Sequence, residues 1–460
     1  MNRTVRSSLG LLAFLSVMLW ALPAGADHPG RYTPSPESTS NNMRLLGSAP
    51  KTDPASFYRN SDLAFRGRLA FAGNYLGFRI IDIADPEAPV VLADVDCPGQ
   101  QHDVSVWRNL LFLSIDRPLT APECGSPQTP VVDGVITPGF EGIRIFDVAD
   151  PRSPRYVGAV ATDCGSHTHT LVPDPDDAGR VLLYVASYPA SALGPTPFGT
   201  QCSRTDPGHS KISIVEVPLA APQQSRVIAQ PTFELNDFTA PGFRGCHDIT
   251  VFLQPRIAAA ACLSEGQMWD LSDLERPRTT ARVHNANVQI WHSAAFTWDN
   301  QLVVFGDEAG GGAGAFCKAS DPSTVGAAWF YRVADLDNLS ATAQEQPLGH
   351  FKIPRPQGEV ANCTMHNFNV IPVRGRYLLV SANYSGGTSV ADFTDPASAS
   401  ELGHFDPHGA NTWSSYWYNN FIYTNDSGRG VDVVLLSDPA RAAARKFPYL
   451  NPQTQESLLD

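Results

Sequence analysis

The chain has 460 residues and a formal net charge of −13 at pH 7, with 43% hydrophobic and 17% charged residues. An acidic chain without a basic run makes nucleic acid and anionic membrane surfaces unlikely partners, so the sequence predicts neither. Its 36 glycines and 38 prolines suit a large, turn-rich β protein. Length alone suggests about three domains, but the repeats described below favour one.

The first 26 residues have the composition of a secretory signal peptide. Arg3 and Arg6 precede an apolar run from Leu11 to Leu22, and the small residues 24–26 follow it. We expect cleavage before Asp27 and a secreted or periplasmic protein. The run is shorter than the ~20 apolar residues of a spanning helix, so no transmembrane segment is predicted, although a retained anchor remains the alternative. A flexible leader is expected over residues 27–42 and a C-terminal tail over 441–460.

A strand–turn unit then recurs along the chain, most clearly at residues 142–158. Ile143 and Ile145 favour a strand, and Asp150-Pro151 favours a turn, because the Asp carboxylate can accept hydrogen bonds from amides just ahead. Copies of this unit lie at residues 80–89, 144–154, 212–218, 267–273, 329–335, 388–396 and 431–439. Two further strands fit between successive copies, and four strands per repeat are typical of propeller blades. The sequence therefore predicts an all-β, seven-bladed β-propeller over residues 43–440.

The sequence also predicts how the ring closes. An apolar residue followed by glycine marks the fourth strand of several repeats, as in Val157-Gly158, Leu348-Gly349 and Leu402-Gly403. No such pair follows the seventh copy, but residues 43–48 near the N-terminus contain one. We expect this N-terminal strand to complete the last blade and to remove its open edge.

These units resemble the LVIVD-repeat family of bacterial exported β-propellers over nearly all of the chain that follows the signal peptide. The resemblance rests on Asp-Leu/Val-x-Asp-Pro-x-x-Pro, seen at residues 147–154. More distantly, the same turn is similar to one in selenium-binding proteins and methanethiol oxidases, propellers that hold a metal with histidines. Their His-Thr-x-His stretch is loosely similar to residues 167–170. The resemblance implies the fold; the activity must come from the site residues, since LVIVD proteins mostly lack an assigned reaction.

Histidines recur where the innermost strand of each repeat begins. Aligning the repeats on their second strand places these residues there: Ser61, His102, His169, His247, His292, His366 and Trp413. Innermost strands line the central channel, so five imidazoles should point into one funnel. Imidazole binds copper, zinc and iron, and Asp103 and Asp248 could orient ring nitrogens. We predict a divalent transition-metal site, with three or four of the histidines sharing the ion.

The alternative for these histidines is architectural, because a side chain in this position can instead hold the neighbouring blade. The remaining loop and outer-strand histidines are expected to be solvated: His28, His209, His284, His350, His404 and His408. Aromatic residues predicted to wall the funnel are Trp291, Trp413, Tyr416 and Trp417.

Carboxylates and amides follow the second strand of most repeats and should surround the same mouth. They are Asp116, Glu265, Asp307, Glu308, Asn383 and Asp426. Glu308 and Glu265 are the predicted catalytic residues, as a general base or as further ligands. The alternative is that such residues cap hairpin turns.

Eight cysteines lie beyond the signal peptide, at positions 97, 124, 164, 202, 246, 262, 317 and 363. An even number in an exported chain predicts disulfides, with pairing in sequence order. A mixed Cys/His metal site remains the alternative.

Two functional hypotheses follow. The first is an exported metal-dependent enzyme of redox or lyase type, acting on a small molecule in the axial funnel. The second is a non-catalytic propeller that binds a ligand or partner and whose histidines are structural; a metal-free cyclisation catalyst lies between them. The chain has no Gly-x-Ser-x-Gly elbow, so hydrolysis through a covalent serine is not expected.

Overall fold

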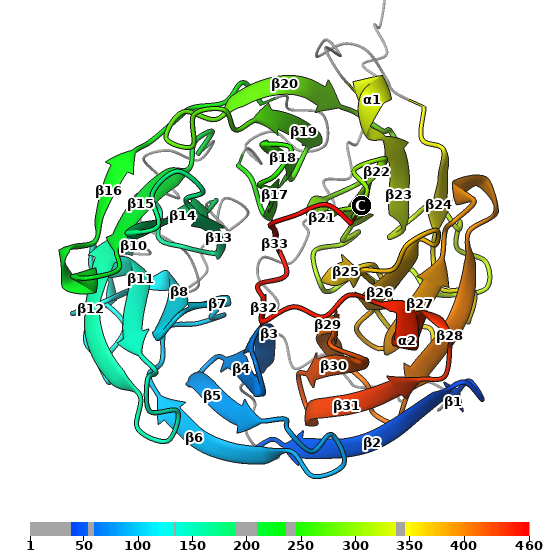
Figure 1. The fold of residues 1–460 in the computed structure, drawn as a ribbon, viewed down its shortest axis with the longest axis horizontal. Helices are drawn as coiled ribbons and strands as arrows, with labels where there is room; N and C mark the ends of the chain where they lie inside the picture. Colours follow the sequence, from blue (N-terminus) through cyan, green and yellow to red (C-terminus); the bar gives the residue numbers. More distant parts are fainter. Residues whose placement is uncertain are drawn as a thin grey trace, which may run out of the picture.

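Seven antiparallel sheets stand around a central channel in the computed structural model (Figure 1). The structure describes residues 38–53, 59–132, 135–188, 209–235, 245–336 and 346–459. The predicted seven-bladed β-propeller is confirmed. The predicted signal peptide, with the leader up to residue 37, lies outside the described residues.

Each blade has four strands, and their order runs from the channel outward. Blade 1 contains β3 (Asn60–Arg66), β4 (Leu69–Asn74), β5 (Gly77–Asp82) and β6 (Val90–Asp96). Blade 2 contains β7 (Val104–Trp107), β8 (Leu110–Leu119), β11 (Phe140–Asp147) and β12 (Arg155–Ala161). Blade 3 contains β13 (Thr168–Pro173), β14 (Arg180–Ala186), β15 (Ser213–Pro218) and β16 (Arg226–Ala229). Blade 4 contains β17 (Ile249–Phe252), β18 (Ile257–Cys262), β19 (Glu265–Asp270) and β20 (Arg278–Val283).

The remaining blades follow the same plan. Blade 5 contains β21 (Trp291–Phe296), β22 (Leu302–Asp307), β23 (Ala328–Arg332) and β24 (Gly349–Phe351). Blade 6 contains β25 (Phe368–Val370), β26 (Leu378–Ala382), β27 (Thr388–Asp392) and β28 (Ser400–Asp406). Blade 7 contains β29 (Thr412–Tyr418), β30 (Phe421–Asp426), β31 (Gly430–Leu436) and β2 (Met43–Pro50). Other elements are β1 (Ser38–Thr39), β9 (Val131–Val132), β10 (Val135–Ile136), β32 (Tyr449–Leu450), β33 (Thr454–Gln455), α1 (Val333–Leu336), α2 (Ala440–Ala443), η2 (Pro222–Gln224) and η3 (Pro396–Ser398).

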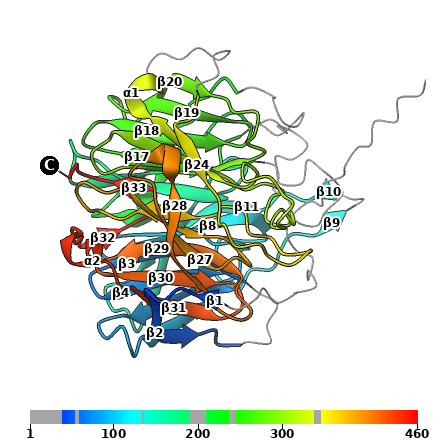
Figure 2. The same cartoon turned by 90° about the vertical axis from the view of Figure 1, so that its right-hand side faces the viewer.

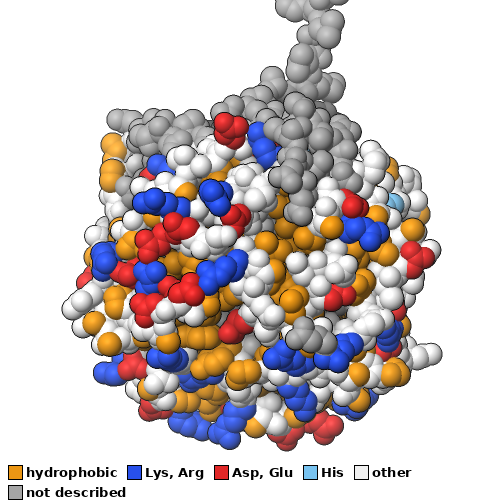
Figure 3. Space-filling view, turned by 45° about the horizontal axis from the view of Figure 1, so that its top comes forward, with side chains coloured by type: hydrophobic (Ala, Val, Ile, Leu, Met, Phe, Trp, Pro, Cys, Tyr) orange, Lys and Arg blue, Asp and Glu red, His pale blue; other side chains and the backbone are white. Residues whose placement is uncertain are grey.

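Adjacent blades bury their apolar faces against each other. Phe71 and Ile80 of blade 1, for example, lie in one buried cluster with Val104 and Leu113 of blade 2. Burial of apolar surface is worth roughly 25 cal/mol per Å², so stacking of the sheets around the ring supplies the core. On the face seen in Figure 3, apolar side chains lie in small patches among acidic and basic ones.

The recurring turn forms for the reason that the sequence suggests. Asp147 Oδ1 accepts a hydrogen bond from the Ala149 amide (2.9 Å), and Asp150 Oδ1 accepts one from the Arg152 amide (2.9 Å). Each carboxylate thus closes an Asx turn two residues ahead. The same pair of bonds recurs in blades 1, 4 and 6. The local chemistry of the repeat therefore fixes the path from the third strand to the fourth.

A β-bulge marks the outer strand of most blades. One extra residue interrupts the pairing with the third strand at Leu46, Leu92, Val157, Ile228, Thr280 and Leu402. Glycine or alanine follows each of them. A Cβ on Gly47 would lie 2.6 Å from the Glu87 carbonyl oxygen of the next blade, so the small residue permits close approach between blades. Three of the apolar–Gly pairs of the sequence, at Leu46, Val157 and Leu402, are such bulges, whereas Leu348-Gly349 leads into β24 without a register shift.

The N-terminal segment lies at the edge of blade 7. β2 pairs antiparallel with β31, with Met43 opposite Leu436 and Pro50 opposite Gly430. β1, in the segment expected to be a flexible leader, pairs with β28 of blade 6. Strands from opposite ends of the sequence therefore share one blade.

The C-terminal segment, residues 449–459, crosses the channel, and we call it the strap (Figure 1). β32 pairs antiparallel with the end of β3, and β33 pairs parallel with the end of β17. Asn451, between these two strands, and Gln455, in β33, hydrogen-bond the backbone of blades 2 and 5 respectively. Figure 2 shows the strap at one face and the β9–β10 hairpin at the other. The strap is the floor of the channel, and the starts of the innermost strands form its mouth.

Candidate metal centre

Four histidines from adjacent blades line the mouth of the channel. They are His167 of blade 3, His247 of blade 4, His292 of blade 5 and His366 of blade 6, and we call them the histidine arc. The backbone amides of His167, His247 and His366 donate to the carbonyls of Ala186, Ala261 and Ala382, which lie near the ends of the second strands. These three therefore hold the same place in their blades. The sequence alignment assigns this place in blade 3 to His169. The alignment is therefore shifted by two residues in that blade, where His167 holds the place.

Each ring of the arc is tied at Nδ1 to a hydrogen-bond acceptor. His167 Nδ1 lies 3.0 Å from Asp116 Oδ2, and His247 Nδ1 lies 3.1 Å from Asp248 Oδ1. His292 Nδ1 lies 2.6 Å from Ser293 Oγ, which donates its own proton to Asn367 Oδ1. His366 Nδ1 donates to the Trp413 carbonyl. Such partners fix the tautomer and leave the Nε2 lone pair available as a ligand.

The Nε2 atoms converge with one carboxylate. His167 Nε2 and His247 Nε2 are 3.0 Å apart. Glu308 Oε2 lies 3.6 Å from His292 Nε2, and Glu308 Oε1 lies 3.7 Å from His366 Nε2. The ligand atoms of His292, Glu308 and His366 all lie within 4.8 Å of one another, as do those of His247, Asp248 and His292. These two groups could hold a metal ion.

Burial sets the charge state of these groups. His292 is 1% exposed and His366 is 2% exposed. Burial, with the neighbouring histidines, holds the pKa of His292 well below its ordinary value, and burial lowers the pKa of His366 to about 3. Burial also raises the pKa of Glu308 to about 8, although the hydrogen bond from Tyr384 opposes this. Neutral imidazoles are the form that binds metal.

Glu308 is held from two sides. It directly follows β22, and Tyr384 donates its hydroxyl proton to Oε1. Tyr384 has a left-handed backbone (φ 46°) and exchanges two backbone hydrogen bonds with Thr412. Its ring packs 4.7 Å from the ring of His366, as does that of Trp413. The aromatic side chains thus form one wall of the site.

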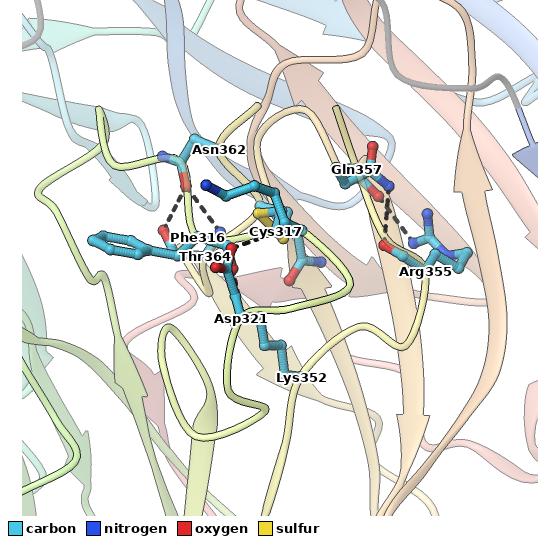
Figure 4. The surroundings of a disulfide bond; sticks show 12 residues. Phe316, Cys317, Asp321, Lys352, Arg355, Gln357, Asn362 and Thr364 are labelled. Atoms are coloured by element: carbon cyan, nitrogen blue, oxygen red, sulfur yellow. Dashed lines mark hydrogen bonds between the residues drawn. A yellow bond between two sulfur atoms is a disulfide. The ribbon is translucent and has the colours of Figure 1, made fainter. Parts of the chain in front are cut away.

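Disulfides anchor the segments that carry these histidines. Cys246, which is bonded to Cys262, lies one residue before His247. Cys363, which is bonded to Cys317, lies three residues before His366. Beside the latter bond, Asn362 Oδ1 accepts from the Thr364 amide (3.0 Å) and hydroxyl (2.9 Å) (Figure 4). Cys97–Cys124 is the third pair. Pairing in sequence order is confirmed for these three; Cys164 is also disulfide-bonded, and its expected partner Cys202 lies outside the described residues.

Two of the five predicted metal ligands lie outside the arc. His169 is buried between blades, with Ser105 Oγ 2.7 Å from Nε2 and Ser114 Oγ 2.8 Å from Nδ1. Its amide donates to Asp103 Oδ2 (2.6 Å), so this residue takes the architectural alternative. His102 has a left-handed backbone (φ 53°), and its Nδ1 lies 2.6 Å from the Asn74 carbonyl. Its Nε2 faces Gly99, and a Cβ on Gly99 would lie 2.7 Å from this nitrogen.

The other predicted catalytic residue, Glu265, is engaged elsewhere. Its carboxylate accepts from Arg282 Nε (2.8 Å) and Nη2 (3.0 Å) and from Gln267 Nε2 (2.6 Å). This buried ion pair within blade 4 supports structure rather than chemistry. Asp307 and Asp426 accept from backbone amides, as hairpin caps do. Asp116, in contrast, orients His167.

Other predictions about exposure also need correction. Trp291, Trp417 and Tyr416 lie in the packed core and only Trp413 reaches the site. His209 is buried, with Nδ1 3.0 Å from the Ser187 carbonyl, and is not solvated. His408 is exposed, and His284, His350 and His404 are partly exposed. His28 lies outside the described residues.

A narrow space of ≈ 10 Å³ separates the arc from the floor. Its lining includes His247, His292 and His366 above, Asp62 and Asp103 at the side and Gln453 of the strap below. That volume holds about one water. A larger molecule therefore has to reach the arc from the mouth.

The comparisons with known proteins bear on the fold alone. No protein-family model matches the chain, and no curated protein matches it. Among solved structures, the computationally designed Ika8 protein is 10% identical (TM-score 0.44) over 85% of this chain and 99% of that one. The C-terminal WD40 domain of Sif2 is 9% identical (TM-score 0.45) over 83% of this chain and 82% of that one. The Dos1 propeller is 9% identical (TM-score 0.46) over 90% of this chain and 83% of that one. Similarity at this level carries no argument about activity.

Two further observations concern location. None of the helices in the described ranges is long and apolar enough to cross a membrane. The three disulfides fit a protein that folds in an oxidising compartment outside the cytoplasm.

Proposed function

We propose that this propeller is an exported metalloenzyme whose ion is bound by His292, His366 and Glu308 at the mouth of the channel. The observation that carries the proposal is the convergence of two imidazole Nε2 atoms on one carboxylate, at 3.6 and 3.7 Å. Both rings are tied at Nδ1 and neutral. Two histidines and one carboxylate form a donor set that suits iron(II) or zinc.

The donor set differs from the one expected from the sequence. The sequence predicts that three or four histidines share the ion, whereas each group within 4.8 Å contains two histidines and a carboxylate. A bound ion of this kind supplies Lewis-acid or redox chemistry at an open coordination position. This agrees with the redox or lyase class inferred from the sequence.

The residues around the site have separate roles in this proposal. Ser293 and the Trp413 carbonyl hold the ring orientations of His292 and His366, and Tyr384 fixes one oxygen of Glu308. Trp413 and Tyr384 exclude water from one side. A small-molecule substrate enters from the mouth, because the strap closes the floor. Export through the N-terminal signal peptide and membership of the LVIVD-repeat family remain part of the proposal.

Metal analysis of protein purified from the exported fraction tests the proposal. We expect bound iron, zinc or copper in the wild type and in His350→Gln, a control at the rim of blade 5. We expect the ion bound by His292, His366 and Glu308 to be lost in His366→Gln and Glu308→Gln, with unchanged melting of the metal-free proteins. No metal in the wild type, or full retention in both site variants, would overturn the proposal.

A second assay separates the enzyme from a binding propeller. Metal-loaded wild type and His366→Gln are compared on one panel of small-molecule oxidation and elimination reactions. Turnover that requires His366 supports the enzyme. Bound metal without turnover on any of them favours the alternative, a propeller that binds a ligand or partner.

A further inference from the structure

We infer that the histidine arc holds a second metal ion, bound between His167 and His247. The inference rests on the proposed function, since it extends the same mouth by two blades. Neither residue belongs to the group of His292, Glu308 and His366. The second position therefore has its own nitrogen ligands and can be tested separately.

The short contact between the two rings is the first argument. His167 Nε2 and His247 Nε2 are 3.0 Å apart, and the Nδ1 of each ring faces a carboxylate, Asp116 or Asp248. With both Nδ1 protons donated to carboxylates, the two Nε2 atoms would place their lone pairs against each other. A cation between them removes that repulsion. At Zn–N bonds of about 2.0–2.1 Å, nitrogens 3.0 Å apart subtend about 94° at the ion.

Further polar groups gather at the same point. Tyr188 Oη lies 3.1 Å from His167 Nε2, and the Gln101 side-chain amide nitrogen lies 3.3 Å from it. A single ring nitrogen makes one well-aligned hydrogen bond, so three neighbours at this range exceed its capacity. The phenol and the amide are placed to complete the coordination of an ion or to bond its water.

Distance excludes one ion shared by the whole arc. Two ligands on opposite sides of one ion are at most about 4.2 Å apart at these bond lengths. In the ranges that the structure describes, no group within 4.8 Å contains three histidines. His292 cannot serve both positions, because one lone pair binds one ion. Two ions, each with its own pair of histidines, use all four Nε2 atoms.

Zinc stoichiometry tests the second ion. The full mature protein, stripped with a chelator, is refilled with Zn²⁺, desalted and analysed for zinc per chain. We expect two zinc ions in the wild type and in His350→Gln, and one in either His167→Gln or His366→Gln. The double variant should hold none. Thermal melting of the metal-free proteins checks that each variant folds, and His167→Asn replaces His167→Gln if the latter melts early.

The other outcomes overturn specific statements. One zinc that is lost in His366→Gln and kept in His167→Gln removes the second ion and leaves the proposed function standing; a shared proton then explains the short contact. One zinc lost in both variants indicates a single ion that the arc moves to share, which also overturns the second ion. No zinc in the wild type overturns both proposals.

Discussion

The mouth and the floor of the channel are built on opposite ends of the same innermost strands, and they treat polar groups in opposite ways. At the floor, Asn451 both accepts from the Val106 amide (2.7 Å) and donates to the Val106 carbonyl (3.0 Å). Gln455 does the same with Phe296 (2.9 and 3.1 Å). At the mouth, each ring of the arc is fixed through one nitrogen and directs the other into the channel.

The difference separates structure from function within one repeated architecture. A fully paired amide replaces a missing backbone partner and contributes stability of about 1 kcal/mol per bond. A buried ring that is fixed through one nitrogen contributes less stability, and such groups persist where they bind something. Changes at the floor should therefore alter stability alone, and changes in the arc should alter metal binding alone.

Removing residues 448–460 should have the largest effect. The truncated protein loses β32, β33 and the bonds of Asn451 and Gln455, so we expect a loss of more than about 4 kcal/mol in unfolding free energy, at about 1 kcal/mol per bond. Denaturant unfolding measures it. Truncation after residue 456 keeps both strands and is the matched control; equal stability of the two truncated proteins would show that the strap does not stabilise the ring.

Replacing His169 by alanine should come next. The substitution leaves Ser105 and Ser114 without their shared partner and opens a cavity between blades 2 and 3. We expect a loss of about 2–4 kcal/mol with unchanged metal content. If metal falls while stability holds, His169 is a ligand after all and the alignment from the sequence is correct.

Asn451→Leu should have a smaller effect on stability. It leaves the Val106 amide and carbonyl unpaired at the floor, which costs about 1–3 kcal/mol. Lys446→Ala, at an exposed position before the strap, is the control and should change little. Metal content should stay at the wild-type value in both. Thermal melting and elemental analysis of the same samples give the two readouts.

His292→Gln should have the smallest effect on stability and a large one on metal. Its Nε2 accepts no hydrogen bond in the part of the chain that the structure describes, so the metal-free protein should lose less than about 1 kcal/mol. Bound zinc should fall from two ions per chain to one, as measured by elemental analysis. A variant that keeps its metal and melts early would reverse the contrast between mouth and floor.

Local sequence chemistry is sufficient to predict the blades. The Asp-x-x-Asp-Pro turn carries its own hydrogen bonds at Asp147 and Asp150, so every copy marks a third strand and its exit. The apolar–Gly pairs likewise mark outer strands, since a bulge needs a small residue next to it. These signals lie within a few residues of each other.

The site is only partly predictable, because its decisive contacts join distant residues. His167 and His169 stand two apart, and residues two apart lie on the same side of a strand, so the sequence allows either register. Only the hydrogen bond from the His167 amide to the Ala186 carbonyl distinguishes the two registers. The pairing of Glu265 with Arg282 could not be predicted, because Arg282 lies on the next strand. The strap escapes prediction because strands of two residues show no periodicity.

The bulges of the outer strands bear on how copies of the molecule meet. A flat outer strand presents unpaired amides and carbonyls on which a strand of another copy can add, and this is a common route to aggregation. An extra residue such as Val157 or Leu92 bends and twists the strand, so the exposed ladder is interrupted after a few residues. A crowded compartment would therefore find the rim of this propeller a poor template, and straightening one bulge by deleting Val157 should promote fibrous self-association.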